Sequence, residues 1–204
     1  MSMGIFYIGI GGVARAGKDS FANSLLNLLK QDGYKAIRSS LAEPLKHDCK
    51  EFISTKLGLD VWTDDTQEKA IFREMLVWYG KVKRQQTEGK YWTDLLTKRV
   101  EIESPEVCII PDIRYSQYPE DEVFWIKDKM KGALIHVQRR DINSDIIPPA
   151  NMDESINDKL VKDNADYQLE WPTVGSDELY VLDQTVKNIY NEIIKPKIHA
   201  TKNS

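Results

Sequence analysis

The sequence predicts an α/β protein in which helices cover both faces of a central parallel sheet. Two observations carry this prediction: short apolar runs alternate with helical patterns along the 204 residues, and several of these runs are continuously apolar. Strands of a parallel sheet are buried on both faces, so they read as continuous apolar runs. Alternation of such runs with helices is typical of a layered α/β domain. The length favours one domain over residues 1–204, since a domain usually takes about 100–200 residues.

The elements follow one another in the expected alternation. Strands are predicted at 5–10, 35–38, 107–110, 133–137 and 167–170, where β-branched, aromatic and other apolar residues gather. Helices are predicted from Phe21 to the stop at Asp32-Gly33, and at 44–57, 66–82, 91–102, 119–131 and 178–194. The polar, proline-containing segment 141–165 shows little periodicity, and the polar end from about Ala200 is predicted to be disordered.

Composition excludes several classes of protein. Hydrophobic residues make up 41% and charged residues 29% of the chain, and no stretch approaches the ~18 consecutive apolar residues of a membrane span. The apolar run Ile5–Ile10 lacks the basic flank and cleavage site of a signal peptide, so a cytoplasmic protein is expected. A net charge of −4 argues against nucleic acid or an anionic membrane as the partner. The two cysteines, Cys49 and Cys108, match no zinc or disulfide spacing.

The strongest motif lies between the first predicted strand and the first helix. Its residues are Gly12, Val13, Ala14, Arg15, Ala16, Gly17 and Lys18, which fit G-x-x-x-x-G-K. Glycines let the backbone wrap a phosphate, the N–H groups point inward, and the helix N-terminus favours negative charge. Lys18 is expected to reach the β- and γ-phosphates of a nucleotide.

The position after the lysine departs from the usual Ser or Thr. Asp19 stands there, followed by Ser20, which is expected to contact the α-phosphate. Asp19 is either a ligand of Mg²⁺ or of its water, or a capping residue at the helix N-terminus that leaves the metal to others. The two interpretations remain open at this point.

The run G-x-x-x-x-G-K-D-S at Gly12–Ser20 resembles the phosphate loop of bacteriophage deoxynucleoside monophosphate kinases and of animal-type phosphomevalonate kinases, two related P-loop kinase groups. Further segments resemble this family in the same order: Leu41–Lys46, the run Phe72–Trp92, and Ile110–Arg114 followed by Ile135–Arg139. The resemblance touches most of residues 5–140. It implies a nucleoside monophosphate kinase-like three-layer α/β/α fold with about five parallel strands. Within this single P-loop kinase domain, an acceptor-binding helical region at about 41–103 and a lid at about 139–165 are expected.

Such a kinase needs cations on both sides of the transferred phosphoryl group. Arginine suits this task because its planar fork binds phosphate oxygens bidentately at any working pH. The candidates are Arg15 and Lys18 in the loop, Lys46, Lys69, Arg73 and Arg84 on the acceptor side, and Arg114, Arg139 and Arg140 further along. Of these, Lys18, Arg73, Arg114 and Arg139 are expected to act in catalysis together with Asp112, and Arg140 to bind the nucleotide. Tyr91 and Trp92 are expected to line the acceptor pocket.

Acidic and amide residues give further candidates. Asp112 ends a buried strand, where it could hold Mg²⁺ through water, orient the acceptor, brace Arg114, or serve only as a turn residue. Asp19 and Asp112 are therefore the predicted metal ligands. Asn151, Glu154, Asn157 and Asp158 either close over the nucleotide or form a solvated loop.

The resemblance implies an ATP- and Mg²⁺-dependent kinase that transfers the γ-phosphate in line to a deoxynucleoside 5′-monophosphate, in a chain of bacteriophage origin. Phosphomevalonate, or a hydroxymethylated pyrimidine in DNA, is the alternative acceptor; a module that binds a nucleotide without transfer is the alternative outside enzymes. The abundant aromatics between 62 and 92 favour a nucleotide acceptor. The expected partners are small nucleotides, not membranes, with nucleic acid disfavoured, and either a monomer or a homodimer is compatible with the sequence.

Overall fold

The computed structural model describes residues 4–175 and 178–202. Its centre is a five-stranded sheet in the order β2-β3-β1-β4-β5, in which every neighbouring pair is parallel. The strands are β1 (Phe6–Gly11), β2 (Ala36–Arg38), β3 (Val107–Ile113), β4 (Ala133–Arg140) and β5 (Tyr167–Pro172). The predicted α/β class with about five parallel strands is confirmed.

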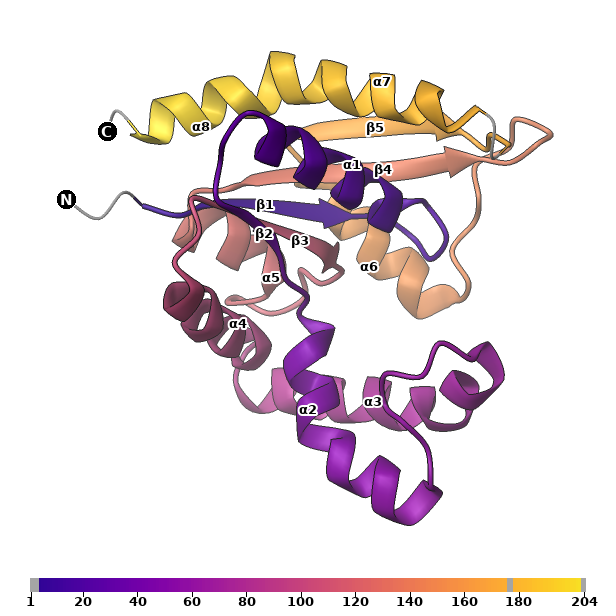
Figure 1. The fold of residues 1–204 in the computed structure, drawn as a ribbon. Helices are drawn as coiled ribbons and strands as arrows, with labels where there is room; N and C mark the ends of the chain where they lie inside the picture. Colours follow the sequence, from indigo (N-terminus) through magenta and orange to yellow (C-terminus); the bar gives the residue numbers. More distant parts are fainter. Residues whose placement is uncertain (1–3, 176–177, 203–204) are drawn as a thin grey trace.

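One face of the sheet is covered by α1 (Lys18–Gln31) and by the C-terminal helices α7 (Leu179–Ile189), η4 (Tyr190–Ile194) and α8 (Lys195–Lys202). In Figure 1, α7 and α8 lie above the sheet and α1 crosses in front of its strands. Because successive strand residues point to opposite faces, Phe6, Ile8 and Ile10 all enter this core. They meet Leu25 and Leu29 of α1, which are fully buried.

The opposite face carries α4 (Lys90–Glu103), α5 (Glu122–Phe124), the π-helical turn η2 (Trp125–Lys129) and α6 (Met152–Asp163). Tyr7 and Cys108 point into this second core, where the Tyr7 ring packs edge-on against Trp125 at 5.5 Å between centroids. Helices on both faces make three layers, as expected.

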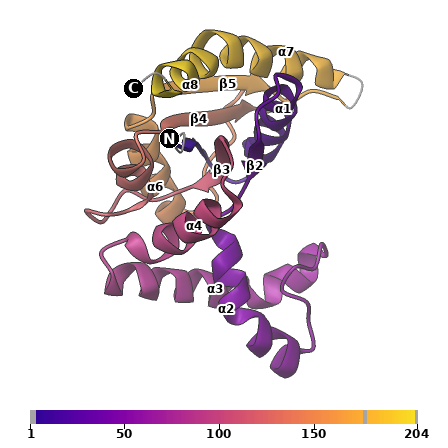
Figure 2. The same cartoon turned by 60° about the vertical axis from the view of Figure 1, so that its left-hand side comes forward.

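The remaining helices form what we call the helical arm: α2 (Ala42–Phe52), η1 (Ile53–Leu57) and α3 (Thr66–Gln86). Figures 1 and 2 both show α2 and α3 projecting away from the sheet. The arm has a small core of its own, in which Cys49, Ile53, Val61 and Phe72 are buried. The side chain of Asp65 begins α3 by accepting a hydrogen bond from the Gln67 N–H at 2.7 Å.

The sequence did not indicate one helix, and two local predictions were wrong or too long. Segment 141–165 contains α6, whose N-terminus is capped by Asn151; only Asn157 and Val161 of this helix are buried, so it shows no apolar periodicity. The predicted helix 119–131 is confined to 122–129. Of the end predicted to be disordered from Ala200, residues 200–202 are helical, and residues 203–204 lie outside the described residues. Among the described residues, no helix has the length and apolarity needed to cross a membrane.

Candidate active site

The candidate site lies at the carboxyl edge of the sheet. β1 pairs with β3 on one side and β4 on the other, so the chain leaves neighbouring strands in opposite directions at this edge. Ligands of open α/β sheets bind in the crevice that such a reversal creates. The predicted phosphate-binding loop, residues 12–17, joins β1 to α1 here, so the strand–loop–helix context of the motif is present.

The loop is shaped by close contacts that exclude side chains. At Gly12 (φ +134°), a Cβ atom would lie 2.2 Å from the carbonyl oxygen of Val137. At Gly17 (φ +89°), it would lie 2.6 Å from the ring of Trp171. Trp171, on β5, also donates a hydrogen bond from Nε1 to the carbonyl of Ala16 at 2.9 Å. The β5 tryptophan thus holds the loop from outside, a role that sequence reasoning missed.

Lys18 is folded back over its own loop. Its Nζ donates to the carbonyl oxygens of Gly12 and Val13, both at 2.7 Å, and only 8% of the residue is exposed. Burial, reinforced by the positive charge of Arg114, lowers the pKa of Lys18 to about 8. A buried ammonium group is stabilised when an anion binds beside it, because the charge of a phosphate would offset the hydration that the group has lost.

A carboxylate from α6 stands against the loop. Glu154 accepts hydrogen bonds from the Ala14 N–H at 2.8 Å and from the Ala150 N–H at 2.6 Å. Glu154 Oε1 thus accepts from a loop N–H group that an oxygen of a phosphate would otherwise bind. The loop therefore already binds an anionic group, and together with Lys18 it fits a nucleotide phosphate.

Two cavities open at this edge. The loop cavity, of about 610 Å³, lies between Gly12, α3 and the start of α6. The arm cavity, of about 420 Å³, lies among α2, α3, α4 and the end of β3. Five residues line both cavities and form their common wall: Arg73, Val77, Lys81, Arg114 and Tyr115.

The predicted cations differ in whether they have partners. Lys46, Arg73 and Arg114 line a cavity, and within residues 4–175 and 178–202 no ion pair or side-chain hydrogen bond engages their charged groups. Lys69 lines the arm cavity but lies 3.4 Å from Asp64. Lys46, Arg73 and Arg114 are therefore the cations most available to a phosphate, because the phosphate would not have to displace a protein anion from them.

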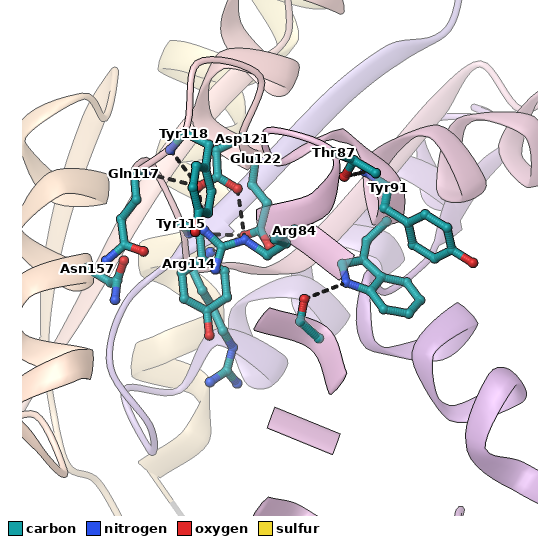
Figure 3. A network of polar contacts seen from close by, with 12 residues as sticks. Arg84, Thr87, Tyr91, Arg114, Tyr115, Gln117, Tyr118, Asp121, Glu122 and Asn157 are labelled. Carbon is teal, nitrogen blue, oxygen red and sulfur yellow. Dashed lines mark hydrogen bonds and ion pairs between the residues drawn. The ribbon is translucent and has the colours of Figure 1, made fainter. Parts of the chain in front are cut away.

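Arg84 is in a different situation. Its Nε and Nη2 donate to the two oxygens of Asp121 at 3.0 and 2.5 Å, and the side chains are 3% and 0% exposed (Figure 3). Its guanidinium also lies 3.5 Å from the centroid of the Tyr115 ring. Burial would lower the pKa of Arg84, but Asp121 outweighs it and the pKa is raised. Arg84 lines the arm cavity, yet its charge is already neutralised.

The two predicted metal ligands both have protein partners. Asp112 accepts from Leu41 N–H at 3.0 Å, Ala42 N–H at 2.9 Å and the Ser40 hydroxyl at 2.7 Å, so it holds the start of α2 at the sheet edge. Asp19 is exposed and paired with Arg38. In the part of the chain that the structure describes, no three His, Cys, Asp or Glu side chains gather as metal ligands.

The other predicted residues lie around this centre. Arg15 and Ser20 are exposed at the loop. Arg139, the last residue but one of β4, has a buried Nε with no partner among the described residues, whereas Arg140, which ends the strand, pairs with Glu170 at 2.6 Å. Neither arginine lines the two cavities.

The two predicted aromatics pack edge-on against each other, at 4.7 Å between ring centroids, but only one of them lines a cavity. Trp92 lines the arm cavity and donates from Nε1 to the carbonyl of Gly80 at 3.2 Å. Tyr91 lies outside both cavities, with its hydroxyl 3.4 Å from Asp48.

The sequence did not single out Glu122, which is 4% exposed and lines the arm cavity. One oxygen accepts from the Arg114 N–H at 2.6 Å and the Tyr115 N–H at 3.1 Å. Burial raises the pKa of Glu122 to about 8. An acidic residue directly before the apolar run Val123–Ile126 was the one available signal.

A family model described as phosphomevalonate kinase matches residues 10–131, which is more than half of the 204 residues. The chain belongs to the phosphomevalonate kinase family. The matched span runs from the end of β1 to the residues just after η2, so it includes the phosphate-binding loop, the helical arm, Arg114 and Glu122. This family is a family of phosphotransferases. The match ends at residue 131, so α6 and the residues after it lie outside it.

Comparison with solved structures gives weak likenesses. Thymidylate kinase from Ehrlichia chaffeensis is 12% identical with a TM-score of 0.45, over 92% of this chain and 99% of that one. Shikimate kinase from Acinetobacter baumannii is 13% identical with a TM-score of 0.42, over 94% and 97%. Nothing about the acceptor follows from such values. No curated protein matches the chain significantly in sequence.

Proposed function

We propose that the protein transfers the γ-phosphate of ATP to a deoxynucleoside 5′-monophosphate, giving ADP and the deoxynucleoside diphosphate. The observation that carries the proposal is the common wall of the two cavities, where no described residue engages the guanidinium of Arg73 or of Arg114. Catalysis of phosphoryl transfer is almost entirely positioning and charge stabilisation. Two free guanidiniums between a phosphate-binding loop and a second cavity suit that task.

On the donor side, the proposal assigns the phosphates of ATP to residues 12–20. The Ala14 N–H and the neighbouring amides would bind phosphate oxygens, and Lys18 would turn from the carbonyls of Gly12 and Val13 toward them. Mg²⁺, when bound with ATP, would neutralise phosphate charge. Asp19 and Asp112 would each have to share or give up a partner to bind that ion, so the proposal assigns no step to it.

On the acceptor side, the wall of the arm cavity supports a nucleotide. Apolar side chains form much of it: Leu41, Leu45, Val61, Phe72, Leu76 and Trp92. A nucleobase buries its faces against such a wall, while its phosphate would reach Arg73 and Arg114 at the common wall. Lys46 adds a further free cation.

Transfer to the acceptor rather than to water requires a closed site. The start of α6 already contacts the loop through Glu154, and Asp153 pairs with Lys81 of α3 at 3.1 Å across the loop cavity. In the proposal, residues 139–165 act as the lid, and this ion pair joins the lid to the arm.

Phosphomevalonate is the second candidate acceptor, and the family match favours it. It is a small, strongly anionic molecule that would use the cations of the common wall. It would leave the apolar part of the arm cavity without a function, which is why we rank it second.

A direct test incubates the protein with ATP and Mg²⁺ and measures ADP release with each deoxynucleoside monophosphate, each ribonucleoside monophosphate, phosphomevalonate and DNA containing hydroxymethylated pyrimidine. We expect rapid ADP release with at least one deoxynucleotide and slow hydrolysis without an acceptor. ATP binding without transfer to any of these molecules would overturn the kinase proposal, and phosphomevalonate as the sole acceptor would overturn the choice of acceptor.

A further inference from the structure

Glu122 places a carboxyl group in the wall of the arm cavity with one oxygen engaged and one free. Oε2 accepts two backbone hydrogen bonds, from Arg114 at 2.6 Å and Tyr115 at 3.1 Å. No hydrogen bond reaches Oε1 from any residue in 4–175 or 178–202, although the residue is only 4% exposed. Because Glu122 lines the arm cavity, a molecule bound there can take the place of water as the partner of Oε1.

The surrounding charges decide which form of the carboxyl group fits. Figure 3 draws two arginines and two carboxyl groups, of which Arg84, Asp121 and Glu122 are buried, whereas Arg114 is exposed. Arg84 is bound through two nitrogens to Asp121, whose Oδ2 also accepts backbone N–H groups from Gln117 and Tyr118 at 2.9 and 3.2 Å. Asp121 is therefore the partner that balances the charge of Arg84, and a second anion beside this pair would be unbalanced.

The remaining charged groups near Glu122 act in both directions. Asp112, at the end of β3, disfavours a second negative charge, whereas Arg84 and the Arg114 backbone N–H favour it. Burial is the largest effect, and the pKa of Glu122 is raised to about 8. Across the cavity, α2 and α3 contribute Lys46, Lys69, Arg73 and Lys81 to its lining. These cations would meet the phosphate of an acceptor.

We propose that Glu122 determines acceptor specificity, donating a hydrogen bond from a neutral carboxyl group through Oε1 to an acceptor atom of the bound molecule. This inference rests on the proposed function, because it takes the arm cavity as the acceptor site. A carbonyl oxygen or ring nitrogen of a nucleobase is the chemical group that a carboxylic acid donor fits. An ionised Glu122 would lose this donor and repel the acceptor phosphate.

The variant Glu122→Gln mimics the neutral form. Its amide oxygen can accept the two backbone hydrogen bonds, and its NH₂ group replaces the donor. For the wild type we expect the KM of the acceptor to rise about tenfold between pH 7 and pH 9, since a group with the stated pKa is mostly neutral at the first pH and mostly ionised at the second. In E122Q the KM should stay flat. Lys18 also titrates in this range, but it is present in both proteins, so the difference isolates Glu122.

Glu122→Ala removes the donor and also the oxygen that accepts from the N–H groups of Arg114 and Tyr115. We expect its acceptor KM to rise at least about tenfold at pH 7, as expected for loss of a hydrogen bond in a buried site, while the KM of ATP changes little. Rescue of the acceptor KM in E122Q separates a contact with the acceptor from general damage to the fold.

The neutral form can be tested without any acceptor. The folded protein holds a proton on Glu122 over a pH range in which the unfolded chain, with a pKa near 4.5, has lost it. Stability therefore falls as pH rises from about 5 to 8. The melting temperature of the wild type should decline relative to that of E122Q over this interval, and parallel curves would overturn the inference.

The outcomes separate this inference from the proposed function. If a deoxynucleotide is phosphorylated but its KM follows the same pH curve in wild type and E122Q, the role of Glu122 is wrong and the function stands. If phosphomevalonate is the acceptor and only the wild type shows the rise, the role stands and the proposed acceptor is wrong. If no molecule accepts phosphate, both are wrong.

Discussion

The loop cavity and the arm cavity share a wall but differ in how their polar groups are occupied. In the loop cavity, Glu154 already accepts from the loop, and Asp153 already pairs with Lys81. In the arm cavity, Lys69 and Arg84 are paired as well, but Lys46, and Arg73 of the common wall, line open space, and no described residue engages their charge. Binding at the loop is therefore an exchange of partners, whereas binding at the arm adds partners. Exchange of partners gives a smaller net free energy of binding than addition of partners, because the existing contacts within the protein are lost when the ligand binds.

The largest effect should come from Lys18. Lys18→Met removes the buried cation that folds back over the loop while keeping the length of the side chain, so we expect kcat to fall by roughly 10²–10³. Lys30→Met, in the last turn of the same helix, is the matched control because its side chain is exposed. Steady-state kinetics of both variants make the comparison. Equal turnover of K18M and wild type would exclude this loop as the donor site.

Arg114 and Arg84 test the difference between a free and a paired cation. Arg114→Ala should reduce kcat by about 10² with little change in melting temperature, since its guanidinium has no described partner. Arg84→Ala leaves Asp121 as an uncompensated buried charge, and we expect it to lower the free energy of unfolding by about 3–5 kcal/mol. Chemical denaturation and kinetics of the two variants are the measurements. A stable, inactive R84A together with an unstable R114A would reverse our assignment.

Glu154 gives the smallest effect and probes the exchange directly. Glu154→Gln keeps the side-chain size but removes the negative charge that competes with nucleotide phosphates for the loop. We expect ATP to bind about three- to tenfold more tightly, which is on the order of 1 kcal/mol. Calorimetry with ATP measures it, and Glu178→Gln, an acidic residue before α7 with no loop contact, is the control. Weaker ATP binding in E154Q would mean that the carboxylate assists the nucleotide instead of competing with it.

The sequence could predict features that depend on neighbouring residues, but not those that depend on partners far away in the chain. The strands and the phosphate-binding loop were predictable because burial on both faces and the glycine pattern are local properties of the chain. Helix α6 was not, since it buries few apolar residues and its capping residue, Asn151, is a common loop residue. The cation candidates were identifiable by residue type, but their partners were not. Arg84 is neutralised by Asp121, 37 positions away, and no local pattern distinguishes it from Arg73.

The most direct measurement of the central claim is phosphorus NMR of the reaction of ATP with an excess of a deoxynucleoside monophosphate. We expect the acceptor signal to decline as the signals of a deoxynucleoside diphosphate and of ADP grow in equal amounts, with little inorganic phosphate, because the closed site excludes water. Growth of inorganic phosphate in place of the diphosphate, or an unchanged spectrum with bound ATP, would contradict transfer between the two cavities.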